Sequence, residues 1–110
     1  MLALAGSVKI FLCHEPVDLR NGFEGLSGLV QTYFAEKLTG GAYFIFLNKA
    51  RDRMKVLYWD VDGLAIWYKR LEKGKFVKGT QPHPLMERRE FLMLLEGVIP
   101  KPLQNRFRVT

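Results

Sequence analysis

Residues 42–59, AYFIFLNKARDRMKVLYW, have the pattern of two β-strands joined by a short loop. The run from Ala42 to Leu47 is short and apolar, which is typical of a buried strand. Residues 53–59 alternate in character after the loop at 48–52. One face carries Met54, Val56 and Tyr58, and the other carries Arg53, Lys55, Leu57 and Trp59. The short loop favours antiparallel pairing of neighbours, so the stretch predicts a β-hairpin.

The residues before this hairpin predict a strand and a helix. Apolar residues alternate over 8–12, which predicts a strand. Asn21 is followed three residues later by Glu24, the signature of a capping box. We therefore expect a helix over 22–37 with a buried face formed by Phe23, Leu26, Val30, Tyr33 and Phe34.

The residues after the hairpin predict two further helices. Asp62 is placed to cap a helix over 63–73, in which Leu64, Trp67, Tyr68 and Leu71 have helical spacing and Gly74 follows as a terminator. Phe76 and Val77 predict a short strand. A last helix is expected over 86–97, with Phe91, Leu92, Leu94 and Leu95 packing inward, followed by a mobile tail from Pro100.

These elements predict an α+β fold in the order strand, helix, strand, strand, helix, strand, helix. The expected sheet is small and mainly antiparallel, and two to three helices cover it. A chain of 110 residues is long enough for one domain and too short for two. We expect a single domain over 1–110, with an ordered core at about 7–99 and a mobile tail at about 100–110.

The charge is unevenly distributed along the chain. The formal net charge is +6, and residues 49–78 hold nine cations against four acids, a net charge of +5. Residues 1–48 hold three cations against four acids. This concentration favours an anionic partner, with nucleic acid ahead of a membrane surface, because no cationic amphipathic helix is apparent.

The cell compartment is predicted from what the sequence lacks. Cys13 is the one cysteine, so no internal disulfide can form, and a cytoplasmic protein is the default. The apolar opening MLALAG is far too short for a secretion signal. No run of about 18 apolar residues predicts a membrane span.

Catalytic chemistry is not expected. Cys13 and His14 are neighbours that point to opposite faces of a strand, so they cannot form a nucleophile–base pair. Three Cys and His residues in total are too few for a zinc site. Asp60 and Asp62 have structural roles at a turn and a cap. We expect no catalytic residue, metal or other cofactor, and a protein that is not an enzyme.

The basic side chains allow two interpretations. They are Lys49, Arg51, Arg53 and Lys55 on the hairpin, and Lys69, Arg70, Lys73 and Lys75 at the end of the expected helix. Cations in a last helical turn interact favourably with the helix dipole and need no further role. Arg53 and Lys55, however, share a strand face with Trp59, where a stacking ring beside phosphate-binding charges is typical of nucleic-acid binding. A solvated face and a surface for an anionic partner both remain open.

Three segments together resemble a known family. They are PVDLRNGFEGLSGLV at 16–30, FIFLNKARDRMKVLYWDVDGLAIWYKRLEKGKF at 44–76 and FLMLLEGV at 91–98. In this order and spacing they are similar to the small accessory protein of bacterial insertion sequences of the sixty-six family, the TnpB-type product of the second open reading frame. The matching motif residues are Asp18, Arg20, Gly22, Phe23, Gly25 and Leu26, then Arg53, Lys55, Trp59, Asp60 and Gly63, then Lys69, Arg70, Leu71, Glu72, Gly74 and Phe76.

The resemblance implies a protein that assists DNA transposition beside a separate, larger transposase that carries out strand transfer. It assigns no catalytic role to any motif residue. The leading hypothesis is a non-enzymatic accessory factor that binds DNA through the hairpin and the following helix. The alternative is an adaptor that binds the transposase without touching DNA, using Trp59, Trp67 and Tyr68 as anchors. A nuclease acting alone is unsupported by the carboxylates.

Overall fold

The computed structural model describes residues 8–77 and 84–96, and its elements form one sheet with helices on both faces. In chain order the elements are β1 (Ile10–Leu12), α1 (Phe23–Tyr33), the 3-10 helix η1 (Leu38–Gly40), β2 (Tyr43–Leu47), β3 (Arg53–Asp60), β4 (Gly63–Arg70), β5 (Leu85–Met86) and α2 (Arg88–Glu96). The sheet order is β4-β3-β2-β1-β5. The predicted α+β class is confirmed.

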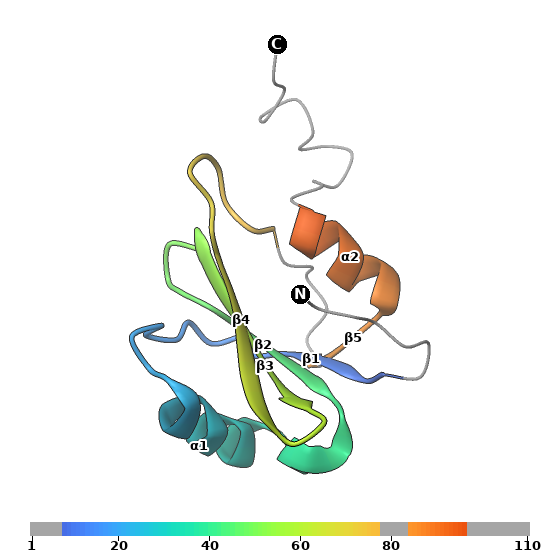
Figure 1. Ribbon diagram of the computed structural model, residues 1–110. Helices are drawn as coiled ribbons and strands as arrows, with labels where there is room; N and C mark the ends of the chain where they lie inside the picture. Colours follow the sequence, from blue (N-terminus) through green and yellow to red (C-terminus); the bar gives the residue numbers. More distant parts are fainter. Residues whose placement is uncertain (1–7, 78–83, 97–110) are drawn as a thin grey trace.

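The sheet is mainly antiparallel, as predicted. β1 and β2 are parallel, and α1 lies in the connection between them; the other neighbouring strands pair antiparallel. Residues of α1 pack on one face of the sheet and residues of α2 on the other. Figure 1 shows the two helices on opposite sides of the strands.

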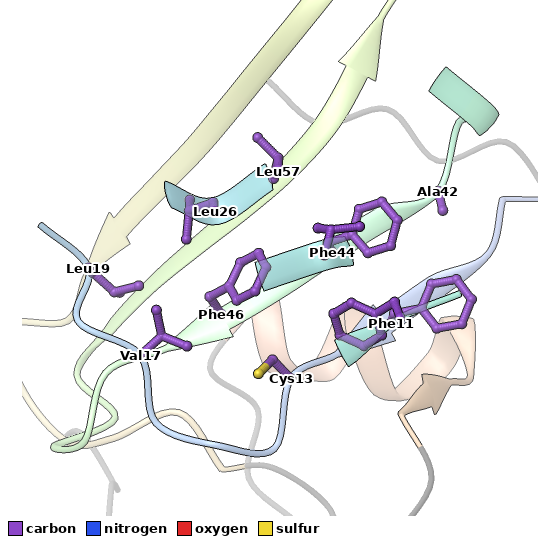
Figure 2. Packing of buried hydrophobic residues seen from close by; sticks show 11 residues of the cluster. Phe11, Cys13, Val17, Leu19, Leu26, Ala42, Phe44, Phe46 and Leu57 are labelled. Carbon is purple, nitrogen blue, oxygen red and sulfur yellow. The ribbon is translucent and has the colours of Figure 1, made fainter. Parts of the chain in front are cut away.

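β2 is the centre of the core because both of its faces are covered. Phe44 and Phe46 belong to the cluster on the α1 face, while Ile45 and Leu47 belong to the cluster on the α2 face. All five residues of β2 are buried. Figure 2 shows Phe44 and Phe46 in the α1-side cluster, where the rings of Phe11 and Phe44 stack with centroids 5.6 Å apart. The apolar run seen in the sequence is therefore a strand buried on two sides.

The prediction of a helix over 63–73 is wrong, because residues 63–70 form strand β4 and residues 71–73 form no helix. β4 pairs with β3 along its whole length, from Asp60 opposite Gly63 to Arg53 opposite Arg70. Asp62 consequently lies in the turn and caps no helix, and Gly74 terminates none. The error has a physical cause. β4 is half-buried on both faces, so consecutive positions are apolar and the same residues also fit a helical period.

The predicted first helix is shorter and starts differently. α1 begins at Phe23 with Gly22 as N-cap and no side-chain cap hydrogen bond, so the predicted capping box is absent. The side-chain nitrogen of Asn21 instead donates to the carbonyl of Asp18 at 2.9 Å. The Asn21 side chain also fills the space beside Gly25, where an added Cβ would overlap it. A larger residue at position 25 would therefore have to displace the Asn21 side chain.

Several predicted core positions are placed differently. Phe23, Tyr33 and Leu92 were expected to be buried and are exposed, while Leu26, Val30, Phe34, Phe91 and Leu94 are buried as expected. Phe76 is buried in the α2-side cluster without belonging to a strand, and Val77 is in none. The predicted mobile tail lies outside the described residues, as does His83, the third of the Cys and His residues considered for a zinc site.

The β3–β4 turn predicts a stabilising substitution. Val61 has φ of 56° and is 90% exposed, so a β-branched residue occupies the left-handed region with no packing to offset the strain. Val61→Gly should raise the free energy of unfolding by about 0.5–1 kcal/mol, measured by urea denaturation. Val61→Ala removes the same methyl groups without freeing φ and should give no comparable gain. Equal effects of the two substitutions would contradict the assignment of strain.

Candidate nucleic-acid interface

The loop between β2 and β3 is held in one shape by Asn48. Its side-chain carbonyl accepts the backbone N–H groups of Asp52 and Arg53, both at 3.1 Å, and its amide donates to the Asp52 carboxylate at 2.7 Å. Arg51 has a φ of 58°, which tightens the turn. Lys49 is exposed on this loop.

The segment after β4 folds back onto the same loop. The N–H of Leu71 donates to the carbonyl of Asp52 at 2.7 Å, and the N–H of Phe76 donates to the carbonyl of Arg51 at 2.6 Å. Burial of the Phe76 ring anchors the segment. Three stretches of chain therefore bring cations to the open end of the β3–β4 hairpin. This basic end consists of Lys49, Arg51, Arg53, Arg70, Lys73 and Lys75.

The basic end continues onto the α1 face of the hairpin. The register places Arg53 opposite Arg70 and Lys55 opposite Tyr68. Tyr68 is about half exposed, at 49%, and its ring helps to line an open groove of 640 Å³. The groove is also lined by Asp18, Arg20, Asn48, Lys49 and Arg53. An aromatic ring thus lies among exposed cations, an arrangement suited to a nucleic-acid strand.

Lys55 has structural partners at this site. Its ammonium donates to the backbone carbonyl of Asn21 at 2.9 Å and lies 5.0 Å from the centroid of the Tyr68 ring. These contacts join β3 to the start of α1 and hold Tyr68 in place. Lys55 therefore positions the interface as well as adding charge to it.

Asp18 and Arg20 form a two-pronged ion pair beside the groove. The Arg20 guanidinium donates to both carboxylate oxygens, at 3.0 Å and 2.6 Å, and the Arg20 backbone N–H adds a bond of 2.9 Å. Hydrogen bonding from the Arg20 side chain, followed by that from its backbone, lowers the pKa of Asp18 to about 2. The pKa of Arg20 is raised by the same partner. Both motif residues stay charged at neutral pH.

Two predicted contact residues lie away from the basic end. Lys69 is on the other face of β4, where its ammonium donates to the carbonyl of Leu95 in the last turn of α2 at 3.0 Å. Trp59 shares a face with Arg53 and Lys55, as predicted, but it lies six positions along the strand from Arg53, a distance of roughly 20 Å. Its indole N–H donates to the carbonyl of Val61 at 3.1 Å beside the acidic Asp60–Asp62 turn.

Further family-motif residues lie at a helix start or a turn and outside the basic end. Gly22 is the N-cap of α1, and Asp60 and Gly63 pair across the two-residue turn. Phe23 is exposed at the start of α1. Tyr68 was predicted as an anchor of the adaptor surface but not as a nucleic-acid contact, because the helical assignment counted it among the packed residues. Strand alternation would have placed it opposite Lys55.

Among residues 8–77 and 84–96, no three His, Cys, Asp or Glu side chains gather as a metal site would require. Cys13 is buried in the α1-side cluster, with its sulfur 3.6 Å from the Glu15 carbonyl oxygen. Within the same described ranges, no helix has the length and apolar character to cross a membrane.

The structure is thus that of a small α+β protein with a basic hairpin end. The sequence matches the family model described as IS66 Orf2 like protein over residues 8–105. The chain belongs to this family, whose members have an accessory role in transposition, and the resemblance inferred from the motifs is confirmed.

Two relatives come from Sinorhizobium fredii (strain NBRC 101917 / NGR234). The uncharacterized protein y4jC is 34% identical over 102 residues, which cover 89% of this chain and 86% of the relative. The uncharacterized protein y4hO is 30% identical over 77 residues, covering 70% of this chain and 67% of the relative. No solved structure matches the chain significantly.

The Asp18–Arg20 pair predicts a pKa that depends on the guanidinium. Arg20→Ala should raise the pKa of Asp18 from about 2 toward 3.8, measured by NMR titration of the carboxyl carbon. Because the folded pKa is depressed, the pair stabilises the fold above pH 3.8, and this contribution is lost as the pH falls through about 2. Arg70→Ala, which breaks the exposed Arg70–Glu72 pair, should leave the Asp18 pKa unchanged.

The Lys69 contact predicts a loss of stability. Lys69→Met removes the cation that caps α2 and should lower the free energy of unfolding by about 1 kcal/mol, measured by urea denaturation. Lys73→Met, at an exposed position, should change it by less than about 0.5 kcal/mol. Equal losses in the two variants would count against a capping role.

Proposed function

We propose that this protein is a non-catalytic accessory factor for transposition that binds DNA through its basic end. The observation that carries the proposal is the convergence of six cations from three separate chain segments, held by the hydrogen bonds of Leu71 and Phe76 to the β2–β3 loop. Five of the six are exposed. Such a cluster suits a polyanion better than a small anion, because it extends over two loops and two strand ends.

The expected binding mode is contact with the phosphate backbone. The groove is lined by Lys49 and Arg53, and a second pocket is lined by Arg53 and Arg70. At both places these cations could neutralise phosphates and release counterions. Tyr68 would add a stacking or sugar contact. Asp18 and Glu72 offset part of the local charge, which limits the attraction for anions in general. Phosphate contacts carry no sequence information, so recognition of element ends would come from the separate transposase.

A protein adaptor that binds the transposase without DNA is the competing function. Half-buried Trp59 and the exposed ring of Tyr68 are residue types that interfaces favour. Trp67 is a weaker anchor than the sequence indicated, because it packs against the α2-side cluster. Co-purification with the transposase after nuclease treatment separates the two functions. A complex that survives the nuclease supports the adaptor, and one that is lost supports bridging by DNA.

The DNA-binding proposal predicts a strong salt dependence that resides in the basic end. The double variant Arg53→Gln, Arg70→Gln should bind duplex DNA more weakly in fluorescence anisotropy titrations. The slope of log K against log salt should fall by about 2, since each lost phosphate contact contributes about 0.9.

The matched control is Lys9→Gln with Lys37→Gln, which removes the same charge from exposed positions away from the basic end. It should keep most of the slope. Lys69→Met serves as a second control because that cation caps α2. Absence of binding by the unmodified protein at low salt would overturn the proposal, and equal losses in the two double variants would exclude the basic end as the contact surface.

A further inference from the structure

The two edges of the sheet differ in how they are protected. One edge is β5, which has two residues and therefore offers little for another strand to pair with. The other edge is β4, which has eight residues, no proline and an apolar stretch from Leu64 to Trp67. Figure 1 shows β4 along one side of the sheet. A long regular edge strand is a template for pairing with another chain.

The register identifies the unpaired backbone groups of this edge. Asp60 and Gly63 flank a two-residue turn, and the N–H of Leu71 donates to the carbonyl of Asp52. Both ends of the hairpin therefore indicate the same alternation, in which the backbone N–H and C=O groups of Ala65, Trp67 and Lys69 bond to β3. The N–H and C=O groups of Leu64, Ile66, Tyr68 and Arg70 point outward. Within the described part of the chain, no backbone hydrogen bond joins these four residues to another segment.

The charges on the edge select its partner. Asp62 lies in the turn before β4, next to Asp60 at the end of β3. At the opposite end, Arg70 lies across from Arg53 and also pairs with the exposed Glu72 at 2.9 Å, which neutralises part of its charge. Asp62 and Arg70 are eight residues apart, roughly 26 Å along a strand. A second copy that pairs antiparallel places the acidic end of each strand beside the basic end of the other. A parallel pair would place like charges together.

We propose that two copies of this chain associate through antiparallel pairing of their β4 strands, which joins their two five-stranded sheets into one continuous sheet in a symmetric dimer. In the register favoured by charge, Ile66 lies opposite its own copy, Leu64 opposite the partner's Tyr68 and Arg70 opposite the partner's Asp62. The four β4 residues in this register have outward backbone groups, and Asp62 is the next alternate position before Leu64. The contact is isologous, so it closes at two copies and leaves no open β4 edge.

Oligomeric state and amide exchange test the dimer in the absence of DNA, so the result does not depend on the proposed function. Sedimentation equilibrium of the full chain should show a shift with concentration from 12.7 kDa to twice that mass. Hydrogen exchange followed by NMR should show slower exchange of the Ile66 and Tyr68 amides as concentration rises. The Ala65 and Trp67 amides, which are bonded to β3, should be protected at both low and high protein concentration.

Charge substitutions test the register. Asp62→Arg alone and Arg70→Asp alone place like charges opposite each other twice in the dimer, and each should weaken it by about tenfold. The two substitutions combined should restore the dimer. Circular dichroism verifies that each variant folds. If a variant does not fold, the amide exchange of the unmodified chain decides whether the β4 strands pair.

A monomer up to high micromolar concentration would overturn the proposal. So would a dimer in which the Ile66 and Tyr68 amides gain no protection, since that dimer would use another surface. A monomer whose β4 amides become protected only when the transposase is added would assign this edge to the transposase instead of a second copy.

Discussion

Burial of β2 on both faces is the constraint on which the rest of the structure depends. Phe44 and Phe46 pack toward α1, while Ile45 and Leu47 pack toward α2. Because all five residues of β2 are buried and four of them are wholly apolar, the strand is stable only with a neighbouring strand on each side and a cover over each face. β1 and β3 supply the neighbours, and the two helices supply the covers. β4 is then left at the edge of the sheet, where its backbone is open and its side chains are half-buried.

The position of β4 separates the charges of the hairpin. β3 begins and β4 ends at the basic end, while the turn between the two strands carries Asp60 and Asp62. The hydrogen bonds from Leu71 and Phe76 to the β2–β3 loop then add Lys73 and Lys75 to the open end. The result is a dipolar hairpin, with an excess of cations at its open end and the acidic Asp60 and Asp62 at its turn. This one feature underlies both the proposed contact with DNA and the proposed antiparallel pairing of two copies.

The parts of the fold that could be predicted are those in which the residue pattern fits only one kind of secondary structure. β2 and β3 were predicted correctly because a short apolar run and a strict alternation are each typical of a strand and fit a helix poorly. The segment 63–73 was misassigned because Leu64, Trp67 and Tyr68 fit a helical period as well as an edge strand. The error also affected the candidate site. It grouped Lys69 with Arg70, which are neighbours on a helix end but lie on opposite faces of a strand.

Four features could be inferred from the sequence alone: the α+β class, the β2–β3 hairpin, the concentration of positive charge in the middle of the chain and the family. Each of these depends on composition, local periodicity or motif order, which need no knowledge of distant contacts. Which cations lie together, in contrast, depends on the three-dimensional arrangement of the strands. Lys69 caps α2 and Lys55 binds the Asn21 carbonyl. Arg53 and Tyr68 line the groove, and both also line a second pocket together with Arg70. These assignments depend on strand register and on the return of residues 71–76 to the β2–β3 loop, and both are set by burial of side chains distant in sequence, such as Phe76.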